Sequence, residues 1–457
     1  MNAPIHPIEQ LHVALPDLDW VTETPRIQRL SQDFSWFSPV LKRQLAGKSA
    51  EAAVRPRNED EIKCLVSLCA RLRIPITIRG AGTGNYGQSV PLQGGVLLDM
   101  SGYNQFLWAR HGAARAQAGI RLWDLEKQAR ADHGLELRCM PSTYRSATLG
   151  GLFGGGFGGA GSITYGPVAA PGNVLGIRVM SVEPEPQIVE LRGAEAMLMH
   201  HVYGTNGIVL EMEVALAPAQ PWVECIAVFD DYDPALEFAS AFGAAPGLVK
   251  KEVCFFGAPV SDYMTALAEY LPRGCHAVIL VLSSSSMDAM QAMLQSYGGR
   301  LTYRKTAAES GSRTLLEYTW NHTTLVALKV DRTLTYIQSG FDPARHMQQA
   351  KALEKALAGE VMMHLEFLRT KEGVFNCSGL QLIRYSSEER LNEIMQIYRD
   401  HGVAINNPHV YILEDGKQGG QLSPAVVALK RRFDPQGLLN PGKMRSWPQS
   451  AAAAAAV

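Results

Sequence analysis

The sequence predicts an α+β protein of two or three domains. Its 457 residues are too many for a single hydrophobic core. From Trp222 onward, apolar segments of strand type alternate with segments of helical period, which predicts an antiparallel sheet with helices on one face. The composition changes at Pro218 and Pro221, and we place the boundary between the two halves of the chain there.

The first half contains a recognisable helix and two strands. Asn58, with Glu61 three residues further on, resembles a capping box, and apolar residues recur behind it at helical spacing. An alternating strand over 74–78 and an apolar strand over 95–100 follow, so these elements predict a βαβ-like unit. A later helix is expected to stop at Gly134, because glycine readily takes the left-handed conformation that ends helices.

Two helices of the second half are marked at both ends. Asp342, followed by proline, is a typical N-cap and predicts a helix that ends at Gly359. Ser386 predicts the start of another helix, which ends at Gly402. The chain then closes with a turn-rich segment over 431–444, where two prolines prevent a long helix.

Charge and composition exclude several classes of protein. Lys and Arg number 43 against 44 Asp and Glu, so no overall field favours nucleic acid or an anionic membrane. No apolar run is long enough for a membrane span, and the N-terminus lacks the pattern of a signal peptide. The seven cysteines form no C-x-x-C pair, so neither a metal nor an iron–sulfur site is expected. We expect a cytoplasmic protein with reduced thiols.

The densest glycine stretch runs from Pro141 to Gly166, where nine of 26 residues are glycine. Glycine costs more backbone entropy than any other residue, but it lets the main chain approach a partner closely. A flexible linker is the alternative, yet linkers of that kind are hydrophilic, whereas this stretch carries Phe153, Phe157 and Ile163. We therefore expect its backbone amides to lie against a flat or anionic ligand.

A second glycine loop follows the strand over 74–78, and both stretches contain a GxGxxG pattern. The patterns are Gly82-x-Gly84-x-x-Gly87 and Gly154-x-Gly156-x-x-Gly159. The dinucleotide fingerprint needs a strand before it and a helix after it. Pro91 argues against a helix after the first GxGxxG pattern, and no strand precedes the second pattern. No GK[ST] follows either, which excludes a P-loop. Successive amides in glycine turns form anion-binding nests, and two nests suit a pyrophosphate with a flat ring system between them.

The order of four motifs resembles a known family. The first motif is R-G-x-G-T-G, which follows a strand. Three more come after it: P-S-x…T-L-G-G…G-G…Y-G, G-x-x-G-I-V and a terminal D-P-x-G-L-L-N-P-G-K. The chain is similar to the FAD-binding oxidases and dehydrogenases of the vanillyl-alcohol oxidase (PCMH-type) superfamily, and most similar to the branch of glycolate oxidase and D-lactate dehydrogenase. The likeness covers about 50–218 and 425–444. It implies a two-part FAD-binding domain and an antiparallel-sheet substrate domain, with the active site between them.

The resemblance also implies domain boundaries. The expected parts are an N-terminal segment 1–45, an FAD-binding domain 46–218, a substrate domain 219–424, a C-terminal return to the FAD-binding domain 425–447 and a disordered tail 448–457.

By the same resemblance, a specific set of residues holds FAD. The loop over 79–85 wraps the pyrophosphate with the start of the second glycine stretch, and other members line the flavin, the adenine end and the flavin edge. The set is Arg79, Gly80, Ala81, Gly82, Thr83, Gly84, Asn85, Pro141, Ser142, Thr148, Gly150, Gly151, Ser162, Tyr165, Gly166, Gly207, Ile208, Val209, Asn440 and Lys443.

We expect FAD to be bound without a covalent link. Covalent members of the superfamily carry His where this chain has Thr83, and they place Cys near Thr143. Cys139 lies four residues from Thr143, so a shift in alignment would reopen the possibility of a covalent bond.

Candidate catalytic residues come from polar side chains of the second half. The flavin carries out the redox step, while the protein places a C–H bond over N5 and takes up a proton. His409 and Tyr411 rank first, because they alternate on one strand shortly before the chain returns to the cofactor domain. The others are His322, His364 and Arg369, with Glu366 on the same face as His364. The same alternation can also be the solvated face of a sheet.

The chain departs from its branch at two motifs. The H-x-G-D-G-N-x-H metal motif and the W-x-x-R carboxylate clamp are both missing; the nearest equivalents are HVYILEDG at 409–416 and Trp320–Thr323. An unpaired buried carboxylate is costly, so a 2-hydroxy acid would need Arg369 or Arg384 to replace the clamp. Oxidation of an alcohol, a phenol or an amine is then equally compatible with the sequence.

We therefore predict an FAD-dependent oxidase or dehydrogenase acting on CH–OH groups of a small molecule, by hydride transfer to flavin N5. Its partners would be that substrate and an electron acceptor, O2 or a carrier, and the chain could form a homodimer. One alternative is a non-catalytic flavin-binding subunit of a complex similar to glycolate oxidase. Another is a nucleotide-binding protein without flavin.

Overall fold

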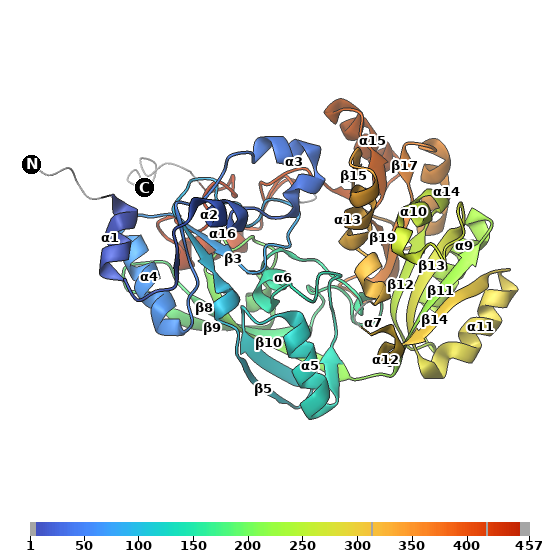
Figure 1. Ribbon diagram of the computed structural model, residues 1–457, viewed down its shortest axis with the longest axis horizontal. Coiled ribbons are helices and arrows are strands. Elements are labelled where there is room, and N and C mark those ends of the chain that lie inside the picture. Colours follow the sequence, from blue (N-terminus) through green and yellow to red (C-terminus); the bar gives the residue numbers. More distant parts are fainter. Residues whose placement is uncertain (1–5, 312–313, 417–418, 448–457) are drawn as a thin grey trace, which may run out of the picture.

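The computed structural model describes residues 6–311, 314–416 and 419–447, and the expected disordered tail lies outside them. The described chain forms a mixed helix and sheet structure with four sheets, two in each half (Figure 1). This agrees with the predicted α+β class and with a two-part first domain beside an antiparallel-sheet domain.

The first sheet has the strand order β1-β2-β4-β3. Its strands are β1 (Trp20–Val21), β2 (Ala52–Val54), β3 (Ile76–Arg79) and β4 (Val96–Asp99). The pairs β2–β4 and β3–β4 are parallel, as a βαβ unit requires. The connecting helix α4 (Glu59–Leu72) starts where predicted, since the backbone N–H of Glu61 donates to Asn58 Oδ1 at 2.9 Å. Short helices precede it: α1 (Pro7–Ala14), α2 (Thr24–Leu30) and α3 (Pro39–Gln44).

The second sheet is antiparallel and has the order β5-β6-β10-β8-β9, with β7 also pairing with β10. Its strands are β5 (Phe106–Arg110), β6 (Ala113–Gln117), β7 (Leu135–Leu137), β8 (Val174–Met180), β9 (Ile188–Arg192) and β10 (Ile208–Pro218). Its helices are α5 (Leu122–His133), α6 (Leu149–Gly155), α7 (Ser162–Tyr165) and α8 (Gly193–Met197). Helix α5 ends at Gly134 as predicted, with φ of 62°.

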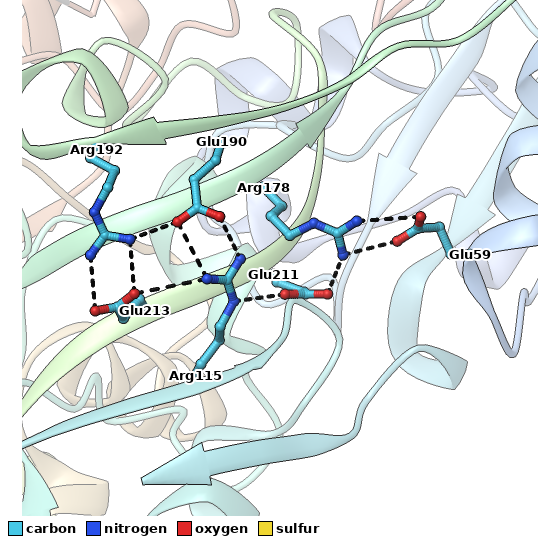
Figure 2. A network of polar contacts seen from close by, with 7 residues as sticks. All are labelled: Glu59, Arg115, Arg178, Glu190, Arg192, Glu211 and Glu213. Carbon is cyan, nitrogen blue, oxygen red and sulfur yellow. Dashed lines mark hydrogen bonds and ion pairs between the residues drawn. The ribbon is translucent and has the colours of Figure 1, made fainter. Parts of the chain in front are cut away.

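One face of the second sheet carries a network of three arginines and four glutamates, which Figure 2 shows. Arg115 is its centre: Nε donates to Glu211 at 2.7 Å and NH2 donates to Glu190 at 2.9 Å. Arg178 bridges Glu211 to Glu59 at the start of α4, and Arg192 joins Glu190 and Glu213 at the far end. The network therefore links β6, β8, β9 and β10 to the helix of the first sheet.

Replacing Arg115 with methionine should lower the free energy of unfolding by about 2 kcal/mol, because Glu190 and Glu211 lose charged hydrogen bonds at a site where Arg115 is only 15% exposed. Arg192→Met is the matched control. Its side chain is 52% exposed, so the loss should stay near ~0.5 kcal/mol. Urea denaturation followed by circular dichroism measures both; equal losses would contradict a network centred on Arg115.

The third sheet is antiparallel and has the order β14-β11-β13-β12-β18-β19-β16-β21, and a small sheet β15-β20-β17 lies beside it. The strands are β11 (Trp222–Phe229), β12 (Lys250–Phe256), β13 (His276–Ser283), β14 (Arg300–Thr306), β15 (Leu334–Tyr336), β16 (Gln338–Gly340), β17 (Val361–Met362), β18 (His364–Arg369), β19 (Phe375–Gly379), β20 (Leu382–Arg384) and β21 (Ala404–Asn406). The helices are α9 (Tyr232–Ala244), α10 (Ala258–Tyr263), α11 (Met287–Ser296), α12 (Ala307–Ser310), α13 (Asn321–Val330), α14 (His346–Ala356) and α15 (Glu388–Asp400).

The expectation of helices on one face of this sheet is wrong. Alternate residues of β11, β12 and β13 belong to two separate apolar cores. One core includes residues of α9, α11, α14 and α15, and the other includes residues of α10 and α13. The strands are buried on both faces, which is the pattern of a sheet covered on both sides.

Both marked helices of this half begin later than predicted. The N-cap of α15 is Ser387, whose Oγ accepts from the backbone N–H of Arg390 at 3.1 Å, so the cap lies one residue after Ser386. Asp342 forms a local turn instead of capping α14: its Oδ1 accepts from the N–H of Ala344 at 2.9 Å. Helix α14 then starts at His346.

The chain returns to the first half at its end. Helix α16 (Pro424–Phe433) packs Leu429 and Phe433 into the core of the second sheet. Leu439 forms a parallel bridge with Ile76 of β3, so the C-terminal segment runs beside the first sheet. Within the described chain, none of the helices has the length and apolar character needed to cross a membrane.

Candidate cofactor and substrate site

A cavity of about 470 Å³ lies where the two halves of the chain meet. The first half lines it with the loop 80–86, Gln88, Ser89, 141–143, 147, 148, 150–158 and 199–204; Ile78, Met100, Ala118, Ala169, Asn206, Gly207 and Val209 also contribute. The second half supplies Trp320, Asn321, Gln338, Ser339, Ser378, Gly379, Leu380, Asn406, Asn407 and Gly416. Its volume falls in the range of ligand pockets.

The two glycine stretches predicted to act together do meet here. A Cβ placed on Gly80 would lie 2.1 Å from Thr148 Oγ1, so the first loop touches the start of the second stretch and needs glycine to do so. Gly82 has φ of 66°, which favours glycine, and a Cβ there would collide with the guanidinium of Arg79. Bare main chain from two separate segments therefore forms one wall of the cavity.

Part of the second stretch is a helix that the sequence did not predict. Thr148 caps α6 by accepting from the N–H of Gly151 at 3.2 Å, and the helix continues through residues that individually disfavour it. A Cβ on Gly150 would lie 2.8 Å from the Cβ of Ala118, which explains a small residue there. A Cβ on Gly154 would meet no heavy atom within 4 Å, although this residue lines the cavity. The space beside Gly154 is thus open to a ligand.

Two hydrogen bonds connect the walls. Tyr86 of the first loop donates its hydroxyl to Gln338 Oε1 at 2.6 Å, and Asn321 Nδ2 donates to Asn85 Oδ1 at 3.0 Å. Burial raises the pKa of Tyr86 to about 12, so its hydroxyl stays protonated near neutral pH. The wall formed by the first glycine loop and the wall formed by the sheet of the second half are therefore tied together.

Most residues predicted to hold FAD line this cavity. They are Gly80, Ala81, Gly82, Thr83, Gly84, Asn85, Pro141, Ser142, Thr148, Gly150, Gly151, Gly207 and Val209. Arg79, Ser162, Tyr165, Gly166, Ile208, Asn440 and Lys443 do not line it.

Three of the predicted residues outside the lining support it from behind. Asn440 Nδ2 donates to the carbonyls of Gln88 and Tyr203, both at 2.7 Å, and Asn440 takes a positive φ of 41°. Lys443 Nζ donates to the carbonyl of Gly87 at 2.5 Å, and burial lowers the pKa of this lysine to about 7. Arg79 donates to the carbonyl of Gln32 at 2.6 Å. These contacts hold the first glycine loop and its flanks in place.

Ser162 and Tyr165 belong to α7, which packs against β12 and β18 of the second half, and Gly166 follows this helix. Ser162 Oγ accepts from the N–H of Gly159 at 3.2 Å and lies 3.6 Å from Cys139 Sγ. A Cβ on Gly166 would lie 3.3 Å from the carbonyl of Thr370. The Cys139 thiol does not line the main cavity, and burial raises its pKa to about 11. Thr83 and Thr143, the two positions compared with the covalent members of the superfamily, do line the main cavity.

His409 and Tyr411, which ranked first as catalytic residues, lie outside the cavity lining. Both ring nitrogens of His409 are engaged: Nδ1 lies 2.8 Å from Ser38 Oγ and Nε2 lies 2.9 Å from the carbonyl of Tyr336. Burial lowers the pKa of His409 to about 4, so the ring is neutral at neutral pH. Tyr411 packs against a small apolar core that includes Leu41, with Lys443 Nζ 5.3 Å from its ring centre.

His322, His364 and Arg369 do not line the cavity either. His322 lies in the first turn of α13, one residue beyond Asn321, and burial lowers its pKa. Arg369 ends β18 and donates to the carbonyl of Gly373 at 3.0 Å. His364 is fully buried with Glu366, and the predicted common face of these two residues is confirmed by a contact of 2.8 Å between His364 Nε2 and Glu366 Oε1.

A buried polar cluster behind Trp320 surrounds this pair. His364 Nδ1 lies 3.1 Å from the carbonyl of Leu380, an acceptor only, so Nδ1 carries the ring proton and Nε2 does not. Burial lowers the pKa of His364 to about 3 and raises the pKa of Glu366 to about 7. The contact at Nε2 is therefore a hydrogen bond donated by a protonated Glu366.

The same cluster fixes Trp320, which lines the cavity. Its backbone N–H donates to Glu366 Oε1 at 2.5 Å, and its indole N–H donates to Glu252 Oε2 at 2.9 Å. Trp320 has φ of 53°, a strained conformation for a residue with a side chain. Burial and the neighbouring Glu366 also raise the pKa of Glu252. Two buried carboxyl groups thus hold a strained aromatic residue at the cavity.

Among the described residues, one group has the geometry to hold a metal ion: Cys254, His364 and Glu366, whose ligand atoms lie within 4.8 Å of one another. All three are buried behind Trp320 and none lines the cavity. A proton on Glu366 supplies the hydrogen bond that His364 Nε2 accepts, so this nitrogen is satisfied without a metal ion.

The raised pKa of Glu366 predicts a pH dependence of stability. The folded protein keeps the proton up to a pKa of about 7, whereas the unfolded chain releases it near the ordinary value of 4.5. Stability therefore falls as pH rises through this window. Glu366→Gln removes the ionisation, so the melting temperature of the unmodified protein should decline relative to that of the variant between pH 5 and pH 7. Parallel melting curves over this range would contradict a buried neutral carboxyl.

The sequence drew attention to the right segments of the second half but not to the cavity residues within them. Asn321 and Asn407 lie two residues or fewer from His322 and His409. Gln338, Ser339 and Asn406 gave no signal, since single amides and hydroxyls occur on any sheet surface. The pairing of β16 with β21 sets Gln338 opposite Asn406, and that register joins segments far apart in the sequence.

Comparisons with known proteins agree with this geometry. A family described as FAD binding domain matches residues 50–191. The glycolate oxidase subunit GlcD of Bacillus subtilis (strain 168) is 25% identical over 427 residues, which cover 86% of this chain and 88% of that protein. The D-lactate dehydrogenase of Anaerostipes hadrus is 29% identical over 181 residues, 37% of each chain.

Among solved structures, alkyldihydroxyacetonephosphate synthase has the same fold. Its TM-score is 0.71 at 16% identity, and the match covers 97% of this chain and 86% of that one. The likeness therefore extends through both halves of the chain, including the sheet wall of the cavity.

Proposed function

We propose that this chain, in which residues 50–191 match a family described as FAD binding domain, is an FAD-dependent oxidoreductase that oxidises a hydroxylated small molecule by hydride transfer to flavin N5. The observation that carries the proposal is the single cavity shared by both glycine stretches and by the sheet of the second half. This arrangement sets a cofactor wall opposite a substrate wall.

The residues present fit the cofactor. The loop over 80–85 offers successive backbone amides for a pyrophosphate, and Gly150 and Gly151 bring the second stretch beside it. The open space at Gly154 accommodates a ligand where any side chain would intrude. When bound there, FAD supplies the two-electron acceptor for a C–H bond. The absence of Cys139 from the lining supports non-covalent binding.

The chain's own residues would orient the substrate. Trp320 and Asn321 at the start of α13 line the cavity together with Gln338, Ser339 and Asn407 of the second half. Gln338 is held by the hydroxyl of Tyr86, and Asn321 by Asn85, so two of these amides are fixed before a substrate arrives. Pre-positioned amides reduce the entropy lost when a hydroxylated substrate is aligned for hydride transfer.

The second candidate function is a non-catalytic flavin-binding subunit of a complex. It is favoured by the position of His409, Tyr411, His322, His364 and Arg369, none of which lines the cavity. The curated relative from Bacillus subtilis is itself named as a subunit.

Anaerobic reduction of the purified holoprotein separates the two. An enzyme should lose its flavin absorbance when mixed with a substrate from a panel of alcohols, hydroxy acids and phenols, and air should then restore it rapidly if O2 is the acceptor. A slow return, accelerated by an artificial electron acceptor, would indicate a carrier. A flavin that dithionite bleaches but no panel member does would favour the subunit.

A further inference from the structure

The sheet wall of the cavity is uncharged. It consists of the indole of Trp320 together with amides and hydroxyls, among them Asn321, Gln338, Ser339 and Asn407. Across the whole described lining, which excludes residues 417 and 418, no Asp, Glu, Lys or Arg is present. The titratable side chains of the lining are histidines and tyrosines of the first half.

Cations near the cavity have other partners. The guanidinium of Arg79 donates to the carbonyls of Gln32 and Ala81, and Lys443 donates to the carbonyl of Gly87. The two arginines that could have replaced a carboxylate clamp also lie outside the lining: Arg369 donates to Gly373, and Arg384 pairs with Asp331 at 3.8 Å.

A carboxylate is costly to bury without a cation. Taking an anion out of water carries a large free-energy penalty, which proteins normally offset with a bidentate arginine or a metal ion. Amides and hydroxyls offset much less of this cost, but they match the donors and acceptors of an alcohol. The described wall therefore suits hydroxyl groups better than the anions of the hydroxy acids after which several relatives are named.

The amides of the wall differ in what they offer a ligand. Asn321 Nδ2 is held by Asn85, and its Oδ1 is buried. Gln338 is bound to Tyr86 through Oε1, which leaves its amide –NH2 to act as the donor.

We propose that the substrate is an uncharged polyhydroxy alcohol, in which one hydroxyl-bearing carbon is oxidised and another hydroxyl binds the amide wall. This inference rests on the proposed function, because it names the substrate class of the same site. The oxidised carbon loses a hydride to the flavin and its hydroxyl releases a proton to solvent water, so the product is the corresponding aldehyde or ketone.

Matched pairs of compounds test the proposal with the holoprotein. The pairs are ethylene glycol and glycolate, propane-1,2-diol and D-lactate, and glycerol and D-glycerate, and the members of each pair differ by a hydroxymethyl group in place of a carboxylate. We expect each diol or triol to reduce the flavin anaerobically at least tenfold faster than its acid. Faster reduction by the acids would overturn the uncharged substrate while leaving the proposed function intact.

Failure of both members of every pair, while another alcohol, hydroxy acid or phenol of the panel bleaches the flavin, would overturn this inference alone. Failure of the whole panel, with a flavin that dithionite still bleaches, would overturn the proposed function as well. A charge-insertion variant gives an independent readout. Asn406→Arg places a guanidinium on the wall and should raise the acid-to-alcohol rate ratio at least tenfold. Arg384→Gln, which removes an exposed cation outside the lining, should leave the ratio unchanged. If Asn406→Arg does not fold, the matched pairs alone decide.

Discussion

Replacing Gly154 with leucine should weaken FAD binding about tenfold to a hundredfold, while the apoprotein remains folded. Gly154 lines the cavity, yet a Cβ at this position would meet no heavy atom of the protein within 4 Å. The new side chain therefore occupies space that the fold leaves open and that the cofactor is proposed to fill. Leucine is also a better helix former than glycine by about 0.8 kcal/mol, so α6 itself should not be weakened.

Titration of apoprotein with FAD, followed by quenching of flavin fluorescence, measures this loss. Gly247→Leu is the matched control: this glycine is exposed, a Cβ added to it would meet no heavy atom within 4 Å, and it lies outside the cavity. Its FAD affinity should stay within about twofold of the parent, since no contact to the cavity changes. Gly154→Leu protein that binds FAD as tightly as the control would remove α6 from the proposed cofactor site.

The cofactor wall was predictable because glycine motifs act through the main chain. A bare backbone loop needs glycine at fixed spacings, and these spacings stand in the sequence whatever the rest of the fold does. The contact between Gly80 and Thr148 adds what the sequence lacked, namely that the two loops touch. Lys443 and Asn440 were predicted to contact FAD, but they donate hydrogen bonds to the main chain of the first glycine loop and its flank and do not line the cavity.

The substrate wall was less predictable because it is assembled by sheet register. Gln338 stands opposite Asn406 only because β16 pairs with β21, which lies far along the chain. Histidines drew attention in this half because their chemistry is versatile, but burial turns His364 and His409 into neutral packing groups with both ring nitrogens engaged. The amides beside them reach the cavity instead. A polar alternation by itself does not distinguish these outcomes.

Long-range packing also explains the misplaced helices of the third sheet. Strands β11, β12 and β13 are buried on both faces, so the sheet is covered on both sides. The alternation of elements along the chain suggested only that helices and strands would pack together. Which face each helix covers depends on the connections of α10 and α13, which the order of elements does not specify.

Replacing Glu366 with leucine should lower the free energy of unfolding by roughly 4 kcal/mol, because it leaves two buried polar groups unpaired at about 1–3 kcal/mol each. The backbone N–H of Trp320 loses its acceptor, and His364 Nε2 keeps only a 3.4 Å contact with Thr323 Oγ1, whose hydroxyl proton is donated to the carbonyl of Tyr318. Leucine has nearly the volume of glutamate, so the loss of hydrogen bonds dominates over any change in packing. Denaturation at pH 5, close to the ordinary pKa of 4.5 and well below the folded pKa of about 7, keeps the contribution from ionisation of Glu366 small.

Glu366→Gln is the informative partner variant. After a small rotation of the side chain, its amide oxygen can accept from Trp320 and its –NH2 can donate to His364, so at pH 5 it should stay within about 1 kcal/mol of the parent. Because Trp320 lines the cavity in a strained conformation, the leucine variant should also shift the flavin absorbance spectrum, whereas the glutamine variant should not. Equal stability of the two variants would mean that only the hydrogen bond from the indole N–H of Trp320 to Glu252 stabilises the strained conformation of Trp320.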